Sequence, residues 1–325
     1  MISKGEKFTF DDILLVPNYA ENDVREFKDA TKSNLFNFEL DVPIIASPMD
    51  SISGTEMMKA MLDAGAIACH HRYCDSASLS YATQYFKGGI AISPSIGIEN
   101  IVYLFKLNPN NFFVIDVAHG DSKRVFDFCK ELLALGITNI ISGNIASITS
   151  AERYLKIGIS HLRAGIGAGS RCLTRKVSGF GYPQASLIDE LHTEFPNAHI
   201  ISDGGCNSTG DVVKSLSFGA EWVMTGFLLA GSSECCQPTG LQGNNFVYRG
   251  MASEEALSAR KAEFFVEGES TIISPKGPVS KTISTIKDAI LAGCHYGGVT
   301  NYRDLTEVNK IRISNSSYLE GLTRK

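Results

Sequence analysis

The chain has 325 residues, of which 44% are hydrophobic and 20% charged, and its formal net charge is −5. This composition is typical of a globular protein, and the lack of a Lys/Arg run argues against nucleic acid or a membrane surface as a partner. No apolar stretch approaches the roughly 20 residues that a membrane span needs, and the polar first residues lack the apolar core of a signal peptide. The eight cysteines include no CxxC pair and no zinc-type spacing, so we expect reduced thiols in a cytoplasmic protein.

Short apolar runs alternate along the chain with amphipathic segments such as 55–65, 121–136 and 208–220. The runs that we predict as strands are 42–47, 66–70, 89–93, 112–117, 139–143, 161–165, 199–203 and 222–226. Eight such units favour a closed (β/α)8 TIM barrel over an open doubly wound sheet. No linker rich in Pro, Gly or Ser marks a second domain. We therefore predict one barrel domain over residues 1–325, with irregular first 40 residues that wrap or plug its bottom.

Two connections are longer than a barrel requires, the one after the sixth strand (165–184) and the one after the eighth (about 231–284). Long loops at the carboxyl ends of barrel strands are where active sites and flaps are built. We therefore predict a catalytic loop after strand 6 and a flap insertion after strand 8.

The loop after strand 6 carries the strongest chemical signal, because a cysteine stands there beside glycines and an arginine. The residues that give the loop this character are Gly165, Gly167, Gly169, Ser170, Cys172, Thr174 and Arg175. Glycines let backbone amides approach a ligand, and amides with a nearby guanidinium lower the pKa of a thiol. A buried, inert cysteine is the alternative, but the catalytic face of a barrel favours Cys172 as a covalent nucleophile.

Glycine pairs after the seventh and eighth strands, in 202–206 and 224–231, predict a phosphate site. Barrels of this class bind phosphate there through backbone amides and a helix N-terminus, although tight turns would need the same glycines. Asp203 is placed to accept hydrogen bonds from ribose hydroxyls, and capping of the following helix is its alternative role.

Further candidates lie at other strand ends and in the flap. Asp116 ends the fourth strand and is predicted to be functional, whereas His119 suits ligand contact and loop packing equally. The basic segment 70–73 fits a phosphate or carboxylate as well as it fits a solvated turn. Glu267 beside Gly268 has the chemistry of an acid or base, but a lone glutamate is by default a surface residue.

Together these motifs resemble the inosine-monophosphate dehydrogenase and guanosine-monophosphate reductase family over nearly the whole chain. The matching segments are 8–17, 42–52, 142–147, 165–175, 179–184, 201–206, 248–253 and 267–277. The reductase branch is the closer match, because the stretch from Met251 to Glu267 is short and lacks the Arg-Tyr pair with which the dehydrogenases activate water. The chain also lacks the regulatory insertion after strand 2 that most dehydrogenases carry, and Tyr182 fits the reductase form of the catalytic loop.

The resemblance implies NADPH-dependent reductive deamination of GMP to IMP and ammonia. The Cys172 thiolate would attack purine C2, Thr174 and Glu267 would relay the proton as ammonia leaves, and hydride would resolve the thioimidate on Cys172. The alternatives are an IMP dehydrogenase without its regulatory domain and a divergent reductase acting on a deoxy or modified guanine nucleotide. A purine sensor without catalysis is less consistent with the sequence, because it needs no thiol and relay.

The resemblance also assigns residues to ligands. The substrate would contact Ser170, Asp203, Gly204, Gly205, Gly226, Phe227, Gly250, Met251, Ala252 and Gly268. The cofactor NADPH would contact Arg25, Asp116, Val117, Ala118, Ile166 and Gly167. A monovalent cation such as K+ would bind mainly backbone carbonyls at Gly167, Gly169, Cys172 and Arg175. The implied assembly is a homotetramer in which Arg25 and the 292–295 turn of a neighbouring subunit complete the cofactor site.

Several positions depart from the family pattern. Ala168 stands in place of a proline, Arg171 in place of a small apolar residue, and Phe227 in place of a small residue. Phe264 replaces an arginine of the reductase branch and His71 replaces a lysine. The loss of two cations at the cofactor or substrate rim bears on the preference for NADPH and on the identity of the nucleotide.

Overall fold

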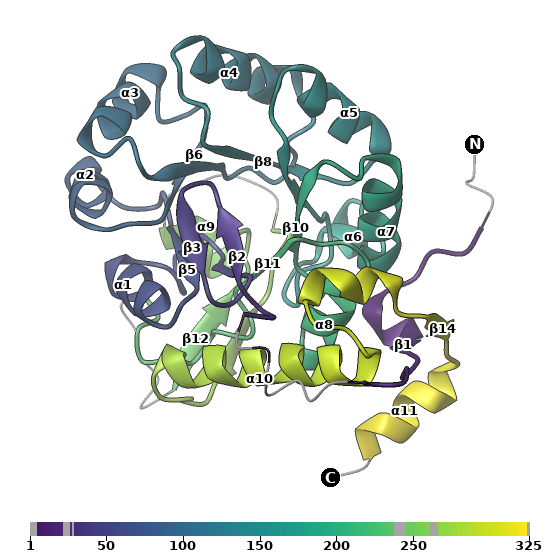
Figure 1. Cartoon of the computed structure of the whole chain (residues 1–325). Helices are drawn as coiled ribbons and strands as arrows, with labels where there is room; N and C mark the ends of the chain where they lie inside the picture. Colours follow the sequence, from purple (N-terminus) through teal and green to yellow (C-terminus); the bar gives the residue numbers. More distant parts are fainter. Residues whose placement is uncertain (1–4, 22–26, 28, 237–244, 260–265, 324–325) are drawn as a thin grey trace.

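The computed structural model describes residues 5–21, 27, 29–236, 245–259 and 266–323. Eight parallel strands close into a barrel in the order β10-β11-β4-β5-β6-β7-β8-β9 (Figure 1). Their bounds are β4 Ile44–Ala46, β5 Ile67–His70, β6 Gly89–Ile92, β7 Phe112–Ile115, β8 Ile140–Ile145, β9 His161–Ala164, β10 His199–Asp203 and β11 Trp222–Thr225. The protein is therefore a (β/α)8 TIM barrel, as the alternating pattern predicted.

The barrel strands are buried on both faces, which explains their nearly continuous apolar sequence. Alternate residues form two cores, because successive side chains of a strand point to opposite faces. Ile45, Ile67 and Val114 pack in the inner core together with Trp222. Their neighbours along the strands belong to the outer core, where the strands pack against the helices.

A ring of helices surrounds the strands (Figure 1). The helices are α1 Thr55–Asp63, α2 Ser76–Tyr85, α3 Ile98–Leu107, α4 Lys123–Ala134, α5 Ile148–Lys156, α7 Gln184–Glu194, α8 Thr209–Ser217 and α10 Val279–Gly297. Side-chain caps fix the start of several of them, including α8, where Ser208 and Asp211 form a reciprocal capping box. This cap starts α8 just after the glycine loop of β10, so the loop and the helix N-terminus face the same end of the barrel.

The bottom of the barrel is closed by a hairpin of β2 (Ser33–Leu35) and β3 (Phe38–Leu40). Leu35, Phe38 and Leu40 join the inner core, and Trp222 donates from Nε1 to the Ser33 hydroxyl at 3.2 Å. The expected irregular structure of the first 40 residues is thus wrong for this segment, because alternate apolar residues pair as strands over the barrel. The expected plug at the bottom is what the hairpin forms.

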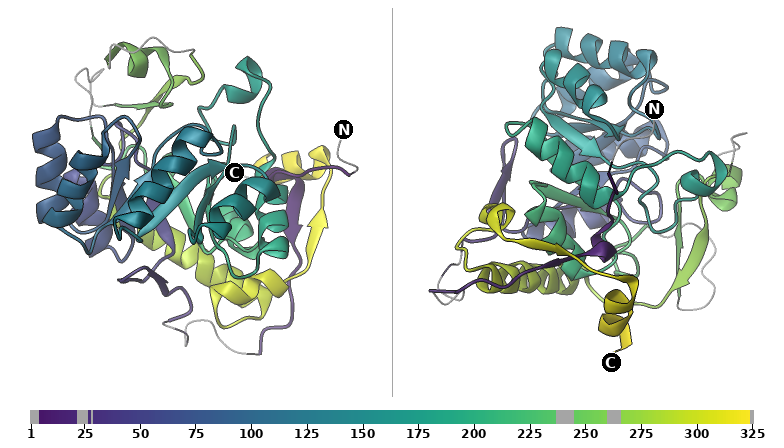
Figure 2. Two further views of the ribbon diagram at one scale, coloured as in Figure 1. Left: turned by 90° about the horizontal axis from the view of Figure 1, so that it is seen from above. Right: turned by 90° about the vertical axis from the view of Figure 1, so that its right-hand side faces the viewer.

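The remaining elements flank the barrel. Strand β1 (Ile13–Leu15), after the 3-10 turn η1 (Phe10–Asp12), pairs with β14 (Lys310–Arg312), and η3 (Tyr302–Glu307) and α11 (Asn315–Thr323) complete the C-terminal part. The short helices α6 (Thr174–Val177) and α9 (Glu254–Ala259) and the ribbon of β12 (Phe246–Arg249) and β13 (Ser270–Ile273) stand out from one end of the barrel (Figure 2). They belong to the two long connections that were predicted as catalytic loop and flap.

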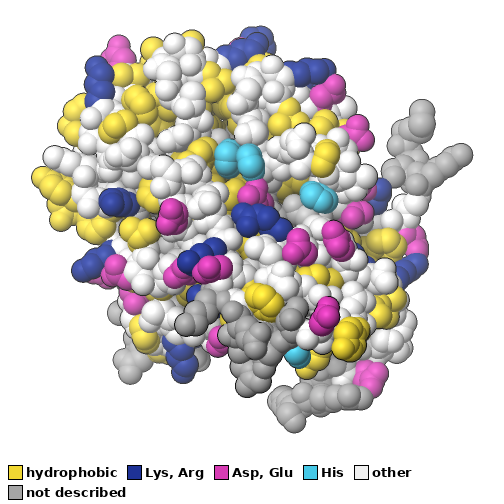
Figure 3. Space-filling model, in the orientation of Figure 1, with side chains coloured by type: hydrophobic (Ala, Val, Ile, Leu, Met, Phe, Trp, Pro, Cys, Tyr) yellow, Lys and Arg dark blue, Asp and Glu magenta, His cyan; other side chains and the backbone are white. Residues whose placement is uncertain are grey.

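On the face seen in Figure 1, basic and acidic side chains are interspersed among apolar ones (Figure 3). In the part of the chain that the structure describes, no helix has both the length and the apolar character to cross a membrane.

Candidate active site

The loop after β9 begins with two tight approaches between backbones. Gly165 has a φ of +147°, and a Cβ there would lie 2.1 Å from the carbonyl oxygen of Asp203. Gly167, with a φ of +74°, lies against the Arg175 side chain. Only glycine fits both places, so these residues bring the loop across the end of β10 and toward the flap.

The predicted catalytic trio is assembled in one line of hydrogen bonds. The Cys172 thiol donates to the Thr174 hydroxyl at 3.1 Å, and that hydroxyl donates to Oε2 of Glu267 at 2.8 Å. Glu267 comes from the flap, 93 residues further along the chain than Thr174. The line forms a continuous path by which a proton can pass between the sulfur and the carboxylate.

Backbone pairing holds the flap against the catalytic loop. The Leu173 amide donates to the Glu267 carbonyl at 2.7 Å, and the Glu269 amide donates to the Arg171 carbonyl at 3.0 Å. These bonds make an antiparallel bridge between Cys172 and Gly268. A Cβ on Gly250 would lie 2.8 Å from the Arg171 carbonyl oxygen, so a glycine here allows the two segments to meet closely.

The other flap residues predicted to contact substrate surround this bridge. Gly250 donates to the Glu269 carbonyl at 2.9 Å, and the Ala252 carbonyl accepts from the Glu267 amide at 2.9 Å. Gly250, Met251 and Ala252 are half-buried, and Gly268 is buried. The flap residues therefore lie beside Cys172, where the reacting ring of a nucleotide would have to be.

The predicted phosphate site is assembled only in part. The Ser170 hydroxyl is buried without a hydrogen-bond partner, and the Gly226 and Phe227 amides donate to no described residue. The Gly205 amide, by contrast, donates to the Ala168 carbonyl at 2.9 Å. The proton of this amide is used within the loop in the present geometry, and contact of Gly205 with a phosphate stays a prediction.

Tyr248 belongs to the same place, although the sequence analysis did not single it out. A Cβ on Gly226 would lie 3.4 Å from the Tyr248 hydroxyl, so the phenol faces the glycine turn after β11. Burial raises the pKa of Tyr248 to about 12, with Ser170 and Arg171 near enough to oppose the shift. A neutral, buried phenol beside Ser170 is a hydrogen-bond donor suited to an anion.

Asp203 is held at the end of β10 by two donors. Arg163 Nε and Asn144 Nδ2 each donate to its Oδ2 at 2.8 Å. Both bonds fall on one oxygen, and Oδ1 has no described donor, which leaves it able to accept from a ribose hydroxyl. Because its carboxylate faces these side chains, Asp203 does not act as the cap of the following helix, a role that Ser208 performs.

Asp116 at the end of β7 is bound from both sides. Arg163 Nη1 donates to its Oδ1 at 3.3 Å and Arg72 Nε donates to its Oδ2 at 3.1 Å. Burial works against the charge of Arg163, but Asp203 and Asp116 outweigh it and raise the pKa of the guanidinium. Arg163 is thus a buried, charged link between the two aspartates.

The remaining residues assigned to the cofactor differ in how far they are exposed. Val117 and Ile166 are half-buried, and Ala118 and the undecided His119 are exposed. Arg25 lies outside the described residues, as does Phe264. The 292–295 segment is helical within α10 and not a turn, because an uninterrupted amphipathic sequence carries the helix on to Gly297.

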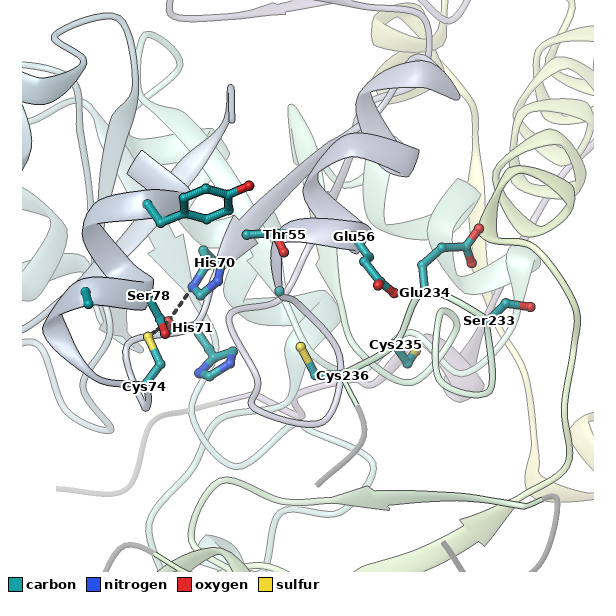
Figure 4. Close-up of a pocket in the computed structure, with 13 residues that line it drawn as sticks. Thr55, Glu56, His70, His71, Cys74, Ser78, Ser233, Glu234, Cys235 and Cys236 are labelled. Atoms are coloured by element: carbon teal, nitrogen blue, oxygen red, sulfur yellow. Dashed lines mark hydrogen bonds between the residues drawn. The ribbon is translucent and has the colours of Figure 1, made fainter. Parts of the chain in front are cut away.

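His71 directly follows β5 and has surroundings of its own. It is buried, its ring stacks on His70 with centroids 5.0 Å apart, and its Nδ1 accepts from the Tyr73 amide. The two histidines line a cavity of about 860 Å³ together with residues of α1, α2 and the segment after β11 (Figure 4). None of the predicted catalytic, substrate or cofactor residues lines this cavity.

Three polar residues of the site were therefore missed from sequence: Asn144, Arg163 and Tyr248. Arg72 belongs to the basic segment 70–73, for which a phosphate or carboxylate contact and a solvated turn were both considered, and it contacts the Asp116 carboxylate. Arg163 carried a usable signal, because alternation along β9 turns it inward between Leu162 and Ala164, and a charge inside a barrel needs a partner. Arg72 and Asn144 stand just after or at the end of a strand, where polar residues of barrels are functional.

Comparison with known proteins places this geometry in a family. A family model described as IMP dehydrogenase / GMP reductase domain matches residues 7–323. The chain belongs to the IMP dehydrogenase/GMP reductase family. It is similar to proteins named GMP reductase from Phytophthora infestans (31% identical, covering 95% of this chain and 91% of the relative) and Ascaris suum (29%, 93% and 91%). It is also similar to GMP reductase 2 of Bos taurus (32% identical, 94% and 93%).

Two departures from the family pattern lie at the nucleotide end of the site. Nε of Arg171 is buried without a hydrogen-bond partner. The Phe227 ring packs against Tyr248 with centroids 5.8 Å apart, and Lys276 Nζ lies 5.9 Å from its centroid. In this member of the family, an extra cation therefore stands directly before Cys172, and an extra aromatic ring packs beside Tyr248.

Proposed function

We propose that the protein is a GMP reductase, which converts GMP to IMP and ammonia with NADPH through a thioimidate on Cys172. The observation that carries the proposal is the line of hydrogen bonds from the Cys172 thiol through Thr174 to Glu267. The names of the relatives and the short flap point the same way.

The first half of the reaction uses the line of hydrogen bonds. The thiol proton passes through the Thr174 hydroxyl toward Glu267, the sulfur forms a bond to purine C2, and the bond from C2 to the amino nitrogen breaks. The amino group and the former thiol proton depart together as ammonia, so this half consumes no external proton or electron. Positioned acids and bases typically contribute about 10²- to 10⁴-fold to such proton transfers.

In the second half, bound NADPH supplies hydride to C2. The bond between C2 and the Cys172 sulfur breaks, the sulfur regains a proton that enters from solvent along the path of Glu267 and Thr174, and IMP is released. The chain supplies no water activator in this scheme. None is needed, because hydride and not water resolves the covalent intermediate.

The nucleotide would be held by groups that are unused within the described residues. Asp203 Oδ1 would accept from the ribose, and the Ser170 hydroxyl with the Gly226 and Phe227 amides would donate to the phosphate. The base would lie against Gly250, Met251, Ala252 and Gly268, in reach of Cys172. Gly204 would line the turn below the ribose.

The residues at the ends of β7 and β9 suit a nicotinamide cofactor. The Asp116 carboxylate is an acceptor that two arginines orient, and exposed Ala118 and half-buried Val117 lie beside it in the chain. Ile166 and Gly167 would form the opposite wall. Cofactor binding here would exclude water from the Cys172 side of the purine.

A monovalent cation would bind the carbonyl groups of Gly167, Gly169, Cys172 and Arg175. The Gly169 carbonyl already accepts from the Cys172 amide at 3.0 Å, and a carbonyl oxygen with a second lone pair can also bind a cation. The Arg175 guanidinium donates to the Tyr182 carbonyl at 2.5 Å, so only the backbone of Arg175 would take part. The functional unit would be a homotetramer, as the family resemblance implies.

The decisive experiment follows NADPH oxidation by the purified protein with GMP, with dGMP in parallel, and measures ammonia. We expect one ammonia for each NADPH consumed, and the ratio of kcat/KM for GMP and dGMP then sets the sugar preference. NAD reduction with IMP, without NADPH oxidation by GMP, would make the protein a dehydrogenase. Inactivity with both GMP and IMP but turnover of a modified guanine nucleotide would make it a divergent reductase.

The matched variant is Cys172→Ala. It should lower kcat on the order of 10⁴-fold or more, the scale expected when a nucleophile is removed. Binding of GMP, measured by calorimetry, should stay within about threefold of wild type because the substitution removes no binding group. Substantial turnover in this variant would rule out the covalent mechanism.

A further inference from the structure

Arg72, directly after β5, is committed to one side of Asp116. Its Nε donates at 3.1 Å to both the backbone carbonyl and Oδ2 of Asp116. Its Nη2 donates to the Tyr73 hydroxyl at 2.7 Å, and the guanidinium lies over the Tyr73 ring, 4.3 Å from the centroid. The Arg72 and Asp116 side chains are only 19% and 11% exposed, so the pair is largely shielded from water.

The contact completes a row of alternating charges across the mouth of the barrel. Arg72 holds Asp116, Asp116 is shared with Arg163, and Arg163 holds Asp203. The row joins β5 and β7 on the cofactor side to β9 and β10 on the nucleotide side. Without Arg72, two carboxylates would share the single guanidinium of Arg163, and Oδ2 of Asp116 would lose its donor.

His71 cannot perform this function, although it stands where the reductase branch has a lysine. Its ring is stacked on His70 and accepts from the Tyr73 amide, and it faces the separate cavity between α1 and α2 (Figure 4). The next residue along the chain supplies a permanent cation instead. A guanidinium can bind the carbonyl and the carboxylate of Asp116 together, which a single ammonium on a flexible stem does less rigidly.

We propose that Arg72 is the positioning residue that fixes the Asp116 carboxylate for the nicotinamide cofactor. This inference rests on the proposed function, because it assigns the cofactor to Asp116. Arg72 acts through Asp116 and does not contact the purine, so its loss affects the cofactor step and leaves the deamination step intact.

The test compares Arg72→Met with Arg72→Lys and with the control His71→Gln. Arg72→Met keeps the length and apolar stem of the side chain but removes the charge. We expect its KM for NADPH to rise by about 10- to 100-fold, the range for a lost hydrogen bond to a charged group. Its KM for GMP and the ammonia released from GMP in a single turnover without NADPH should stay within about threefold of wild type.

Arg72→Lys should recover at least half of the lost NADPH affinity on a logarithmic scale, and His71→Gln should leave it within about threefold of wild type. Equal KM values for NADPH in wild type and Arg72→Met would overturn the proposal, as would a parallel loss of GMP deamination. If Arg72→Lys recovered none of the lost NADPH affinity while its melting temperature matched that of wild type, the charge-based role of Arg72 would also be overturned.

Direct NADPH binding, followed by nicotinamide fluorescence, separates this proposal from the proposed function. If wild type binds NADPH but does not deaminate GMP, the proposed function fails and the Kd ratio of wild type and Arg72→Met still decides the role of Arg72. If wild type binds no NADPH, both proposals fail.

Discussion

Strands β9 and β10 carry titratable groups at both ends of the barrel. Those at one end form ion pairs, whereas those at the other end stack as rings. At the top, Arg163 pairs with Asp203 at 2.8 Å and with Asp116 at 3.3 Å. At the bottom, His161 and His199 stack with ring centroids 4.3 Å apart, and Phe36 covers His161 at 4.1 Å. The same two strands thus place ion pairs where ligands would bind and an aromatic stack where the hairpin closes the barrel.

The difference lies in the partners and not in the degree of burial. Burial, with a smaller contribution from His199, lowers the pKa of His161 to about 3, so the ring is neutral near pH 7. Arg163 is at least as buried, yet its pKa is raised because carboxylates stand on both sides. A buried group in this barrel keeps its charge only where an opposite charge lies within hydrogen-bond reach.

Arg163→Met is expected to have the largest effect on stability, because it leaves Asp116 and Asp203 buried with one partner fewer each. We expect the free energy of unfolding to fall by about 3–5 kcal/mol, the usual cost of removing one side of a buried ion pair. Urea denaturation at pH 7, monitored by circular dichroism, measures the loss. A change below about 1 kcal/mol would mean that the two carboxylates do not depend on Arg163.

The bottom of the barrel is tested by pH. Below about pH 6.5 the unfolded chain protonates His161, whereas the folded chain keeps it neutral down to about pH 3. Unfolding therefore takes up a proton in this range, and stability is lost as pH falls from about 6.5 toward 3.

His161→Phe keeps a ring in the stack and removes the titration. We expect wild type to lose about 1–2 kcal/mol more than this variant between pH 7 and pH 5. Urea midpoints of both proteins at the two pH values give the comparison. Identical pH dependence in the two proteins would show that His161 is protonated in the folded state as readily as in the unfolded chain.

The smallest effect is expected for Glu221, a carboxylate beside His199 at the bottom of the barrel. Glu221 accepts from His199 at 2.6 Å and pairs with Arg303 at 3.2 Å, but its partners are more than 40% exposed. Burial opposes its charge, yet these contacts leave the pKa of Glu221 below its ordinary value. Glu221→Gln should therefore cost at most about 1 kcal/mol at pH 7, an effect that disappears as pH falls below about 4. A loss as large as that of Arg163→Met would remove the contrast between the two ends.

Local patterns were sufficient for the barrel, and the family resemblance named three residues that the structure brings into contact. Each predicted strand overlaps an observed one, because a run buried on both faces must be apolar throughout. Cys172, Thr174 and Glu267 followed from a resemblance over continuous motifs, and their contact in the structure is consistent with that reading. Their catalytic roles remain predictions until activity is measured.

The hairpin and the row of charges could not be read in the same way. The hairpin turns at Phe36, which has a φ of +53°, and a phenylalanine there is no turn signal. Its position is stabilised by the His161 ring from a strand far along the chain. Likewise, Arg72, Arg163 and Asp203 become neighbours only after the barrel closes, and no spacing in the sequence records that.

The antiparallel bridge between Cys172 and Gly268 fixes the register of the flap against the loop after β9. Two backbone bonds fix which residue stands opposite Cys172, and a slip of one position would turn the Glu267 side chain away from Thr174. The contact between Glu267 and Thr174 therefore depends on backbone pairing as much as on the identity of the two side chains, and a change that shifted this pairing would break it with both residues still present.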